Sequence, residues 1–359
     1  MTDEHYMSIA LKLAERNLGL VAPNPSVGCV IVKYGVIIGE GQTAPGGRPH
    51  AETVALTNSK MSPQDSIMYV TLEPCCHQGV TGPCADEIIR SKIKKVVVAT
   101  VDPDKRVSGG GIKKLIEAGV EVVQGVMKEE AEDLNIGFFT TRRLHRPWIT
   151  CKIATTLDGK IASASGDSKW ITQEDTREWV HQVRAKYDAV MIGSNTLVSD
   201  DPLLTCRIPG MEDRSPVRII IDSQQRLKET HKIAKTADKV KTWIVTNKEV
   251  TMKIQFVNYL VVESNGDGKV CMKDAMEKIA SVVGITRLLV EGGGGLLTEL
   301  LKENLIDRLI MCRSGKIIGN DGVPCVRDLG IATISKCLRF RKVEVKEFSE
   351  DVAEVWDKL

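Results

Sequence analysis

The sequence predicts a two-domain α/β protein in which each domain is a β-sheet covered by helices. Three observations lead to this fold class. The chain has 359 residues, which exceeds the size of one ordinary domain. Strand-like and helix-like segments alternate along almost its whole length, as they do in α/β proteins. A basic stretch at 140–147 interrupts the alternation, so we place the boundary there, with domains at 1–145 and 146–359.

The first half shows short Val/Ile-rich runs between amphipathic segments. Pro23 and Pro25 stop any regular element between the first helix and the first strand. Tyr34 and Gly35 separate two apolar runs and indicate a hairpin. Strands are therefore expected at 28–33, 36–41, 67–72, 95–101 and 120–125, and helices at 3–19, 50–58, 84–91 and 112–118.

The second half repeats this alternation with longer connections. Strands are expected at 148–154, 189–193, 217–222, 242–246, 259–262, 287–291 and 309–313, with a last strand or hairpin within 338–355. Helices are expected at 176–186, 272–283 and 296–304.

Composition narrows the classes of function. The chain carries 49 basic and 47 acidic residues, a net charge of +2, which gives no electrostatic reason to expect nucleic acid or an anionic membrane as a partner. No run approaches the ~20 apolar residues of a membrane span. The acidic N-terminus lacks the pattern of a signal peptide, and ten cysteines without regular spacing suggest reduced thiols plus a metal site. We therefore expect a cytoplasmic protein.

Four residues of the first half form the pattern of a zinc deaminase. His50 stands two residues before Glu52, and Cys75 follows a proline and precedes Cys84 by nine residues. Three protein ligands, His50, Cys75 and Cys84, leave one zinc position for water, which ionises near neutral pH. Glu52 is then placed to take the proton and pass it to a leaving amine.

Each part of this pattern also has a structural interpretation. A single His-x-Glu is common and usually carries no function. His77 lies between the cysteines and could be a fourth ligand, but that would exclude the water, so a loop or substrate-contact role is favoured. Cys76 is interpreted as a packed thiol, because adjacent cysteines rarely reach one metal, and Cys29 as a core residue, because it lies in a buried strand pattern.

The second half contains a candidate phosphate site at Gly292–Gly295. These glycines follow the expected strand at 287–291 and precede a helix, whose N–H groups could bind a phosphate. The same pattern is often only a structural turn, and it is not a Rossmann fingerprint. Gly109–Gly111 has the same two interpretations. Arg184 and Arg207 could bind phosphate or be surface arginines.

Several further motifs occur in one order along the chain. Besides His50-Ala51-Glu52 and the two cysteines, they are PNPSVG at 23–28, DP at 102–103, LDGKIA at 157–162, GDSKWIT at 166–172, DDPLLTCR at 200–207, IDS at 221–223 and EGG at 291–293. Together they resemble the bifunctional deaminase/reductase family of riboflavin biosynthesis, and the resemblance runs nearly end to end.

The resemblance implies a cytidine-deaminase-like three-layer α/β/α domain followed by a dihydrofolate-reductase-like α/β domain. The first would deaminate a 2,5-diamino-6-ribosylaminopyrimidinone 5′-phosphate with one Zn²⁺ per chain. The second would use NADPH to reduce the ribosyl group to ribityl. The expected partner is this small pyrimidine ribotide, not nucleic acid or membrane, and the chain would form a homo-oligomer, either a dimer or a tetramer.

The resemblance also implies a role for individual residues. His50, Cys75 and Cys84 would bind zinc, Glu52 would be catalytic, and Asn24 would contact the pyrimidine. In the reductase, the residues expected to meet the cofactor are Ala154, Trp170, Thr196, Asp200, Ser223, Gly293, Gly294, Gly295, Leu296, Leu297, Thr298 and Glu299. Those expected to meet the substrate are Ser168, Arg184, Leu204, Arg207 and Glu291. Trp170 could instead be a core residue.

The chain departs from the family near the zinc motif. Val80 stands where Lys or Arg is usual, Gly82 replaces a proline, and Asp104-Lys105 replaces Asn-Pro. We expect the zinc site to be intact and the substrate contacts to differ, with Lys105 or Arg106 restoring part of them. Two rival hypotheses are a deaminase acting on a nucleic-acid base and a metal-free binding or assembly partner.

Overall fold

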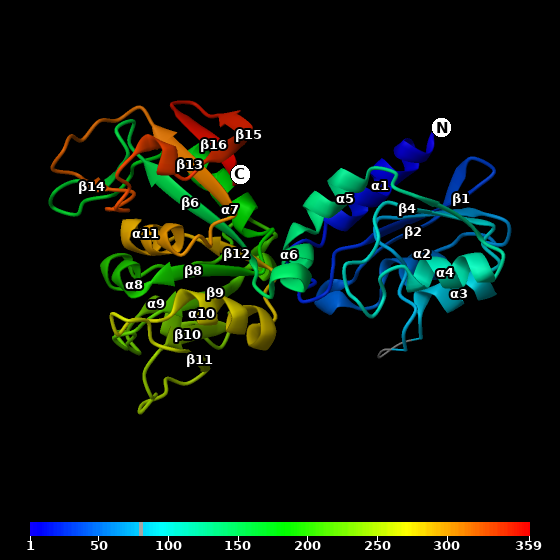
Figure 1. Ribbon diagram of the computed structural model, residues 1–359, viewed down its shortest axis with the longest axis horizontal. Helices are drawn as coiled ribbons and strands as arrows, with labels where there is room; N and C mark the ends of the chain where they lie inside the picture. The colour runs from blue at the N-terminus through cyan, green and yellow to red at the C-terminus, as the bar shows by residue number, and fades with distance from the viewer. Residues whose placement is uncertain (79–81) are drawn as a thin grey trace. The chain divides into compact units, whose positions relative to one another are not determined.

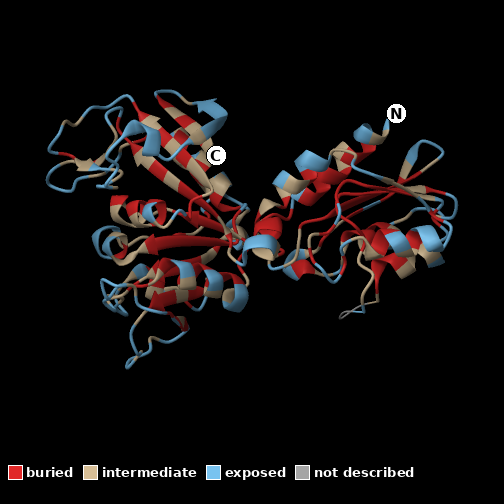
Figure 2. Ribbon diagram, viewed as in Figure 1, coloured by how far each residue is buried: buried red, intermediate tan, exposed pale blue. Residues whose placement is uncertain are grey.

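The computed structural model describes residues 1–78 and 82–359. The chain divides into two compact units, Met1–His145 and Arg146–Leu359, and each is an α/β unit (Figure 1). In both, the central strands are buried, while exposed residues lie mainly on the outer helix faces and the loops (Figure 2). The core of each unit therefore lies between its sheet and its helices.

The first unit contains a five-stranded sheet with strand order β2-β1-β3-β4-β5. Its strands are β1 (Gly28–Lys33), β2 (Val36–Gln42), β3 (Ile67–Val70), β4 (Lys95–Val98) and β5 (Glu121–Gln124). β1 runs antiparallel to β2 and β3, whereas β3, β4 and β5 are parallel to one another. All five expected strands are present; β1 has the expected bounds, and the other four have shifted ends.

Helices cover both faces of this sheet. They are α1 (Asp3–Glu15), α2 (Ala51–Thr57), α3 (Cys84–Arg90), α4 (Gly110–Glu117), α5 (Lys128–Leu134) and α6 (Ile136–Leu144). Met7 of α1 and Ala131 of α5 belong to the core on one face. Ala55, Ile88 and Leu115, from α2, α3 and α4, belong to the core on the other. The expected three-layer α/β/α architecture is confirmed.

The second unit contains a nine-stranded sheet with strand order β11-β10-β9-β8-β12-β6-β13-β16-β15. Its strands are β6 (Trp148–Thr155), β8 (Ala189–Gly193), β9 (Val217–Ile221), β10 (Thr242–Thr246), β11 (Val257–Val261), β12 (Arg287–Val290), β13 (Arg308–Ser314), β15 (Phe340–Glu347) and β16 (Asp351–Lys358). The strands from β11 to β13 are parallel, and β16 and β15 add an antiparallel hairpin. A small separate sheet pairs β7 (Lys160–Ala162) with β14 (Val323–Pro324).

The helices of this unit are α7 (Glu174–Arg184), α8 (Ser194–Asp200), α9 (Lys232–Lys235), α10 (Met272–Lys278), which continues as a π-turn over Ile279–Val283, and α11 (Gly294–Lys302). α10 and α11 pack over the largest core, which includes Met276 and Leu300. Among the described residues, no helix combines the length and apolarity needed to cross a membrane.

Six elements, α5, α6, α8, α9, β7 and β14, are not predicted by the sequence pattern. Residues 128–134 are mostly charged, and their apolar contacts come from few positions, so no helical period is visible there. Residues 136–144 contain adjacent Phe138 and Phe139, which is more typical of strands than of helices. In the structure both phenylalanines are buried in the core of the first unit, and this packing outweighs the local preference.

Candidate active sites

Helix α2 brings His50 and Glu52 to the sheet of the first unit. His50 is the residue before the helix, and Glu52 in its first turn is only 4% exposed. Glycines in β2 allow this close approach, because a Cβ on Gly41 would lie 2.2 Å from the Ala51 carbonyl oxygen. The hairpin strand therefore needs glycine there for α2 to lie where it does.

The two cysteines come from the segment leading into α3. Cys84 is the first residue of that helix, and its N–H donates to Cys75 Sγ at 3.3 Å. Thr53 Oγ1 of α2 donates to Glu87 of α3 at 2.8 Å, which ties the two helices together. Both sides of the site are thus held by regular structure.

The side chains of His50, Cys75 and Cys84 converge on one point. His50 Nδ1 lies 3.3 Å from Cys84 Sγ and 3.7 Å from Cys75 Sγ, and all three ligand atoms lie within 4.8 Å of one another. A tetrahedral zinc, with bonds of ~2.0 Å to nitrogen and ~2.3 Å to sulfur, places its ligands ~3.5 Å apart. The three residues therefore fit a zinc ion with a fourth position open.

The charges around this point are consistent with a metal site. A hydrogen bond with Cys84 lowers the pKa of Cys75 to about 4, and His50 adds to this effect. The same hydrogen bond raises the pKa of Cys84. Burial raises the pKa of Glu52 to about 7, although nearby His50 opposes this. Glu52 is thus poised to exchange a proton near neutral pH.

Glu73, two residues before Cys75, anchors the segment that carries Cys75, which is called the ligand segment below. Its buried carboxylate accepts backbone N–H groups from Asp102, Gly109, Gly111 and Ile112 at 2.9–3.2 Å. A Cβ on Gly111 would lie 1.9 Å from the Pro74 carbonyl oxygen, so α4 packs directly against this segment. The glycine run therefore binds an internal carboxylate, which gives these N–H groups a structural role.

A cavity of about 410 Å³ lies beside the three convergent ligands. Asn24, His50, Glu52, Cys75 and His77 line it. A Cβ on Gly47 would lie 2.0 Å from the Asn24 side-chain nitrogen, so the loop at 45–47 packs closely against that amide. His77 is not among the convergent ligands, so it contacts the cavity without joining the metal set.

The residues at which the chain departs from the family pattern do not all lie at this cavity. Arg106 lines it and is bound by both oxygens of Asp104, whereas Lys105 is exposed and does not line it. Gly82 does not line it either, and Val80 lies outside the described residues. Of the two basic residues expected to restore substrate contacts, only Arg106 is in position.

The candidate site of the second unit lies at the carboxyl ends of its parallel strands. Thr196 follows β8, Ser223 follows β9, and Glu291 with the glycines follows β12. Ligands of open α/β sheets bind at this edge, because helix N-termini and loops converge there. The parallel topology therefore gathers residues that are distant in the sequence.

The first cavity at this edge has a volume of about 670 Å³. It is lined by residues expected to meet the cofactor: Thr196, Ser223, Gly293, Gly294, Gly295, Leu296, Thr298 and Glu299. A Cβ on Gly294 would lie 2.6 Å from the Pro324 carbonyl oxygen, so glycine is needed where α11 begins. Leu297 is 2% exposed and packs in the core beneath, away from the cavity.

The second cavity has a volume of about 620 Å³ and shares Ile161, Thr196, Ser199 and Gly293 with the first. It is lined by the remaining expected residues: Ala154, Ser168, Trp170, Asp200, Arg184, Leu204, Arg207 and Glu291. The Trp170 side chain is 63% exposed and lies under the Arg177 guanidinium at 4.5 Å. It is therefore a wall of the cavity, not a core residue.

Comparison with known proteins decides the family. Residues 147–353 match the RibD C-terminal domain, and residues 1–100 match the cytidine and deoxycytidylate deaminase zinc-binding region. The riboflavin biosynthesis protein RibD of Aquifex aeolicus is 42% identical over 354 residues, covering 98% of this chain and 97% of that protein. The chain belongs to the RibD family. RibD of Escherichia coli is 36% identical, with 98% of each chain covered.

Solved structures agree with this assignment. A diaminohydroxyphosphoribosylaminopyrimidine deaminase/5-amino-6-(5-phosphoribosylamino)uracil reductase from Thermotoga maritima is 34% identical, with a TM-score of 0.89 and 99% of each chain covered. Acinetobacter baumannii RibD is 33% identical, with a TM-score of 0.90 and the same coverage. The chain is therefore a bifunctional enzyme of riboflavin biosynthesis, with a zinc-binding deaminase domain and a reductase domain whose cofactor is NADPH.

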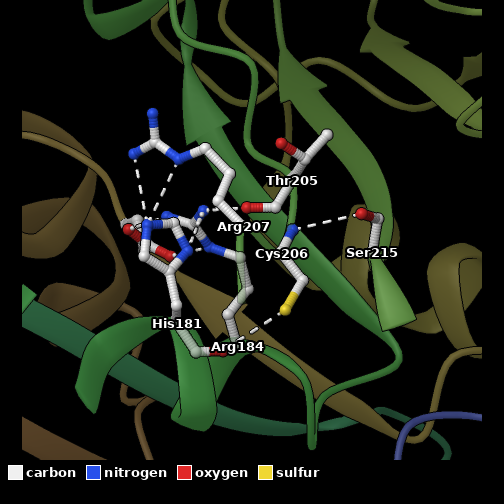
Figure 3. A network of polar contacts seen from close by, with 7 residues as sticks. His181, Arg184, Thr205, Cys206, Arg207 and Ser215 are labelled. Atoms are coloured by element: carbon white, nitrogen blue, oxygen red, sulfur yellow. Dashed lines mark hydrogen bonds and ion pairs between the residues drawn. The ribbon is translucent and has the colours of Figure 1, made fainter. Parts of the chain in front are cut away.

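The two arginines expected to bind substrate in this RibD-family reductase differ in their surroundings. Arg184 is buried and pairs with both carboxylate oxygens of Glu291, at 2.8 and 2.9 Å. Arg207 is exposed and contacts His181 Nε2 through Nε and Nη2, at 3.3 and 3.2 Å (Figure 3). Arg184 thus has its charge compensated within the protein, whereas Arg207 faces the cavity beside a neutral ring.

The roles of Glu73 and His181 in these sites are not predicted by the sequence pattern. Glu73 directly precedes the Pro74-Cys75 pair, but a glutamate there gives no sign of the four N–H groups that it accepts. His181 stands three residues before Arg184 on α7, a spacing that places both on one helix face. That spacing is the only sign in the sequence that His181 and Arg184 act together. It indicates no function by itself, because the contact with Arg207 depends on the position of the loop at 204–207.

Proposed function

We propose that the unit at 1–145 deaminates 2,5-diamino-6-(5-phosphoribosylamino)pyrimidin-4-one and that the unit at 146–359 reduces the ribosyl group of the product to ribityl. The proposal rests first on the convergence of His50, Cys75 and Cys84 beside a cavity that also contains Glu52. The names of the similar proteins supply the substrate.

In the deaminase, His50, Cys75 and Cys84 would hold zinc, which when bound supplies Lewis-acid activation of water. Glu52 takes up a proton at its carboxylate and delivers it to the departing amine, because burial holds its pKa near neutrality. Asn24, fixed against Gly47, is placed to hydrogen-bond the pyrimidine edge. These residues orient the ring and move the proton.

In the reductase, NADPH would supply the reducing equivalents from the first cavity. The N-terminus of α11, behind Gly293 and Gly294, offers backbone N–H groups to its phosphates. The substrate would occupy the second cavity, with its phosphate at Arg207 and its sugar near Ser168 and Glu291. The two cavities adjoin at Thr196 and Gly293, and this adjacency supports direct transfer between the two ligands.

The deciding experiment supplies the zinc-loaded chain with the diaminopyrimidine ribotide. We expect ammonia release without NADPH, and NADPH oxidation that depends on the deaminated product. A chain that instead deaminates a free nucleoside or a tRNA, and leaves the ribotide unchanged, would contradict the proposal.

We also propose that the chain works as a homo-oligomer, a dimer or a tetramer, in the cytoplasm. The family resemblance supports this, as does the edge strand β15, which leaves Val343 and Val345 about half exposed. Light scattering of the purified protein tests the assembly, and a monomer at micromolar concentration would contradict it. Fractionation of cells tests the location.

A further inference from the structure

A chain of polar contacts connects the core of the second unit to the rim of its substrate cavity. It begins at Glu291, whose carboxylate binds Arg184 on α7. Arg184 Nη1 donates to the Thr205 carbonyl oxygen and lies 3.4 Å from His181 Nδ1. The ring then contacts Arg207, as Figure 3 shows for its labelled members.

The loop that carries Arg207 is fixed at both sides of this contact. Cys206 is buried, its Sγ lies 3.9 Å from the His181 carbonyl oxygen, and its N–H donates to Ser215 Oγ at 3.1 Å. The backbone beneath Arg207 is therefore anchored. The side chain of Arg207 is long and exposed, so it keeps its conformational freedom. Among the described residues, only His181 hydrogen-bonds to its guanidinium.

His181 is suited to this task because its ring is neutral. Burial, together with the positive charges of Arg184 and Arg207, lowers the pKa of His181 to about 4. A neutral ring has one acceptor nitrogen, and both donors of Arg207 point at Nε2. Because a neutral imidazole carries a single proton, that proton must then lie on Nδ1. In this tautomer Nδ1 and Arg184 Nη1, which lie 3.4 Å apart, are both donors, so we infer that Arg207 and not Arg184 donates to the ring.

A neutral acceptor holds Arg207 without reducing its attraction for an anionic ligand. A carboxylate at this place would fix Arg207 but also cancel its charge and compete with a phosphate. Imidazole fixes the guanidinium and leaves its charge intact. The Nη1 of Arg207 donates to no described residue and remains available to the cavity. By contrast, Glu291 already neutralises Arg184.

We propose that His181 is a positioning residue of the reductase, which holds Arg207 in place through Nε2 so that its guanidinium meets the phosphate of the substrate already ordered. The inference rests on the proposed reductase function. Fixing a long side chain before the ligand arrives removes an entropic cost of binding, so the effect should fall on substrate affinity.

The test compares His181→Ala, His181→Gln and Arg207→Ala in the full zinc-loaded chain, with Gln182→Ala, an exposed neighbour on α7, as the control. We expect His181→Ala to raise the KM for the ribotide roughly tenfold, as for a freed arginine side chain, with kcat and the KM for NADPH nearly unchanged. His181→Gln, whose amide oxygen can still accept from Arg207, should recover most of the affinity.

The double variant distinguishes positioning from general damage. If His181 acts through Arg207, then His181→Ala should add little in an Arg207→Ala background. An equal loss in both backgrounds, a fall in kcat alone, or no rescue by His181→Gln would overturn the proposal. An Arg207→Ala variant with an unchanged KM would also overturn it, while leaving the proposed reductase activity standing.

A second readout does not require activity. The ¹⁵N spectrum of the histidine side chains, of which the chain has six, reports the protonation of each ring nitrogen. We expect an unprotonated Nε2 at His181 that shifts when inorganic phosphate is added, and no such shift in Arg207→Ala. Failure of the wild type to oxidise NADPH would contradict the proposed function, and an Nε2 that carries the proton, or that phosphate leaves unmoved, would contradict the role of His181.

Discussion

Replacing Glu73 with glutamine tests how the ligand segment of the deaminase is held. Oε1 of this carboxylate accepts from Gly111 and Ile112, and Oε2 accepts from Asp102 and Gly109. Glutamine keeps one acceptor oxygen and turns an amide NH₂ toward the other two N–H groups. Each lost bond to a charged acceptor is worth about 1.5–3 kcal/mol, so the substitution should destabilise the first unit by roughly 3–6 kcal/mol.

The assay is denaturant unfolding of the full chain, together with its zinc content and both activities. Zinc content and ammonia release should fall, because Cys75 follows Glu73 by two residues, while NADPH oxidation on the deaminated substrate should persist. Glu117→Gln, on the exposed face of α4, is the matched control. A loss of stability below roughly 1 kcal/mol, with full zinc content, would refute the argument that the carboxylate holds this segment.

Three further predictions concern other parts of the chain. Glu52→Gln should keep zinc and the reductase activity but slow ammonia release by roughly 10²–10⁴-fold, which metal analysis and both assays check. Gly294→Ala should lower stability by roughly 1–3 kcal/mol, because its Cβ would meet the Pro324 carbonyl, whereas Gly295→Ala, with 3.7 Å to its nearest neighbour, should not. The KM of the reductase for the ribotide should rise as the pH falls toward 4. Burial and two arginines lower the pKa of His181 to about 4, so its ring becomes protonated in that range, and a KM that does not change with pH would contradict this.

The sign of that pH effect follows from the groups around His181. Arg184 on the same helix and Arg207 on the loop repel a protonated ring, and Glu291 attracts it only in part because Arg184 neutralises it. The neutral ring that accepts from Arg207 therefore prevails above the lowered pKa and is lost below it. His181→Gln has no such titration, so its KM should lack the rise.

The zinc ligands and the central strands could be predicted from the sequence alone. His50, Cys75 and Cys84 carry their chemistry in residue type and spacing, and the structure brings them together. The strands at 28–33 and 242–246 have the predicted bounds, because buried Val and Ile runs are distinctive even without tertiary context.

Other features depend on contacts that the sequence does not reveal. The N–H groups of Gly109–Gly111 looked available for a phosphate, and only the fold shows that Glu73 accepts from Gly109 and Gly111 and the Val107 carbonyl oxygen from Gly110. Arg184 and Arg207 looked alike as phosphate partners. Glu291, 107 residues from Arg184 in the chain, makes the difference between them. Such long-range pairs leave no local pattern.

The central claim is that one chain carries a zinc deaminase site and a separate reductase site that act in succession. The most direct measurement follows ammonia and NADPH together after the diaminopyrimidine ribotide is added to the zinc-loaded chain. The account predicts that ammonia appears first and at the same rate without NADPH, and that NADPH oxidation follows with equal final yield. NADPH oxidation without prior ammonia release, or no ammonia release at all from the zinc-loaded chain, would contradict it.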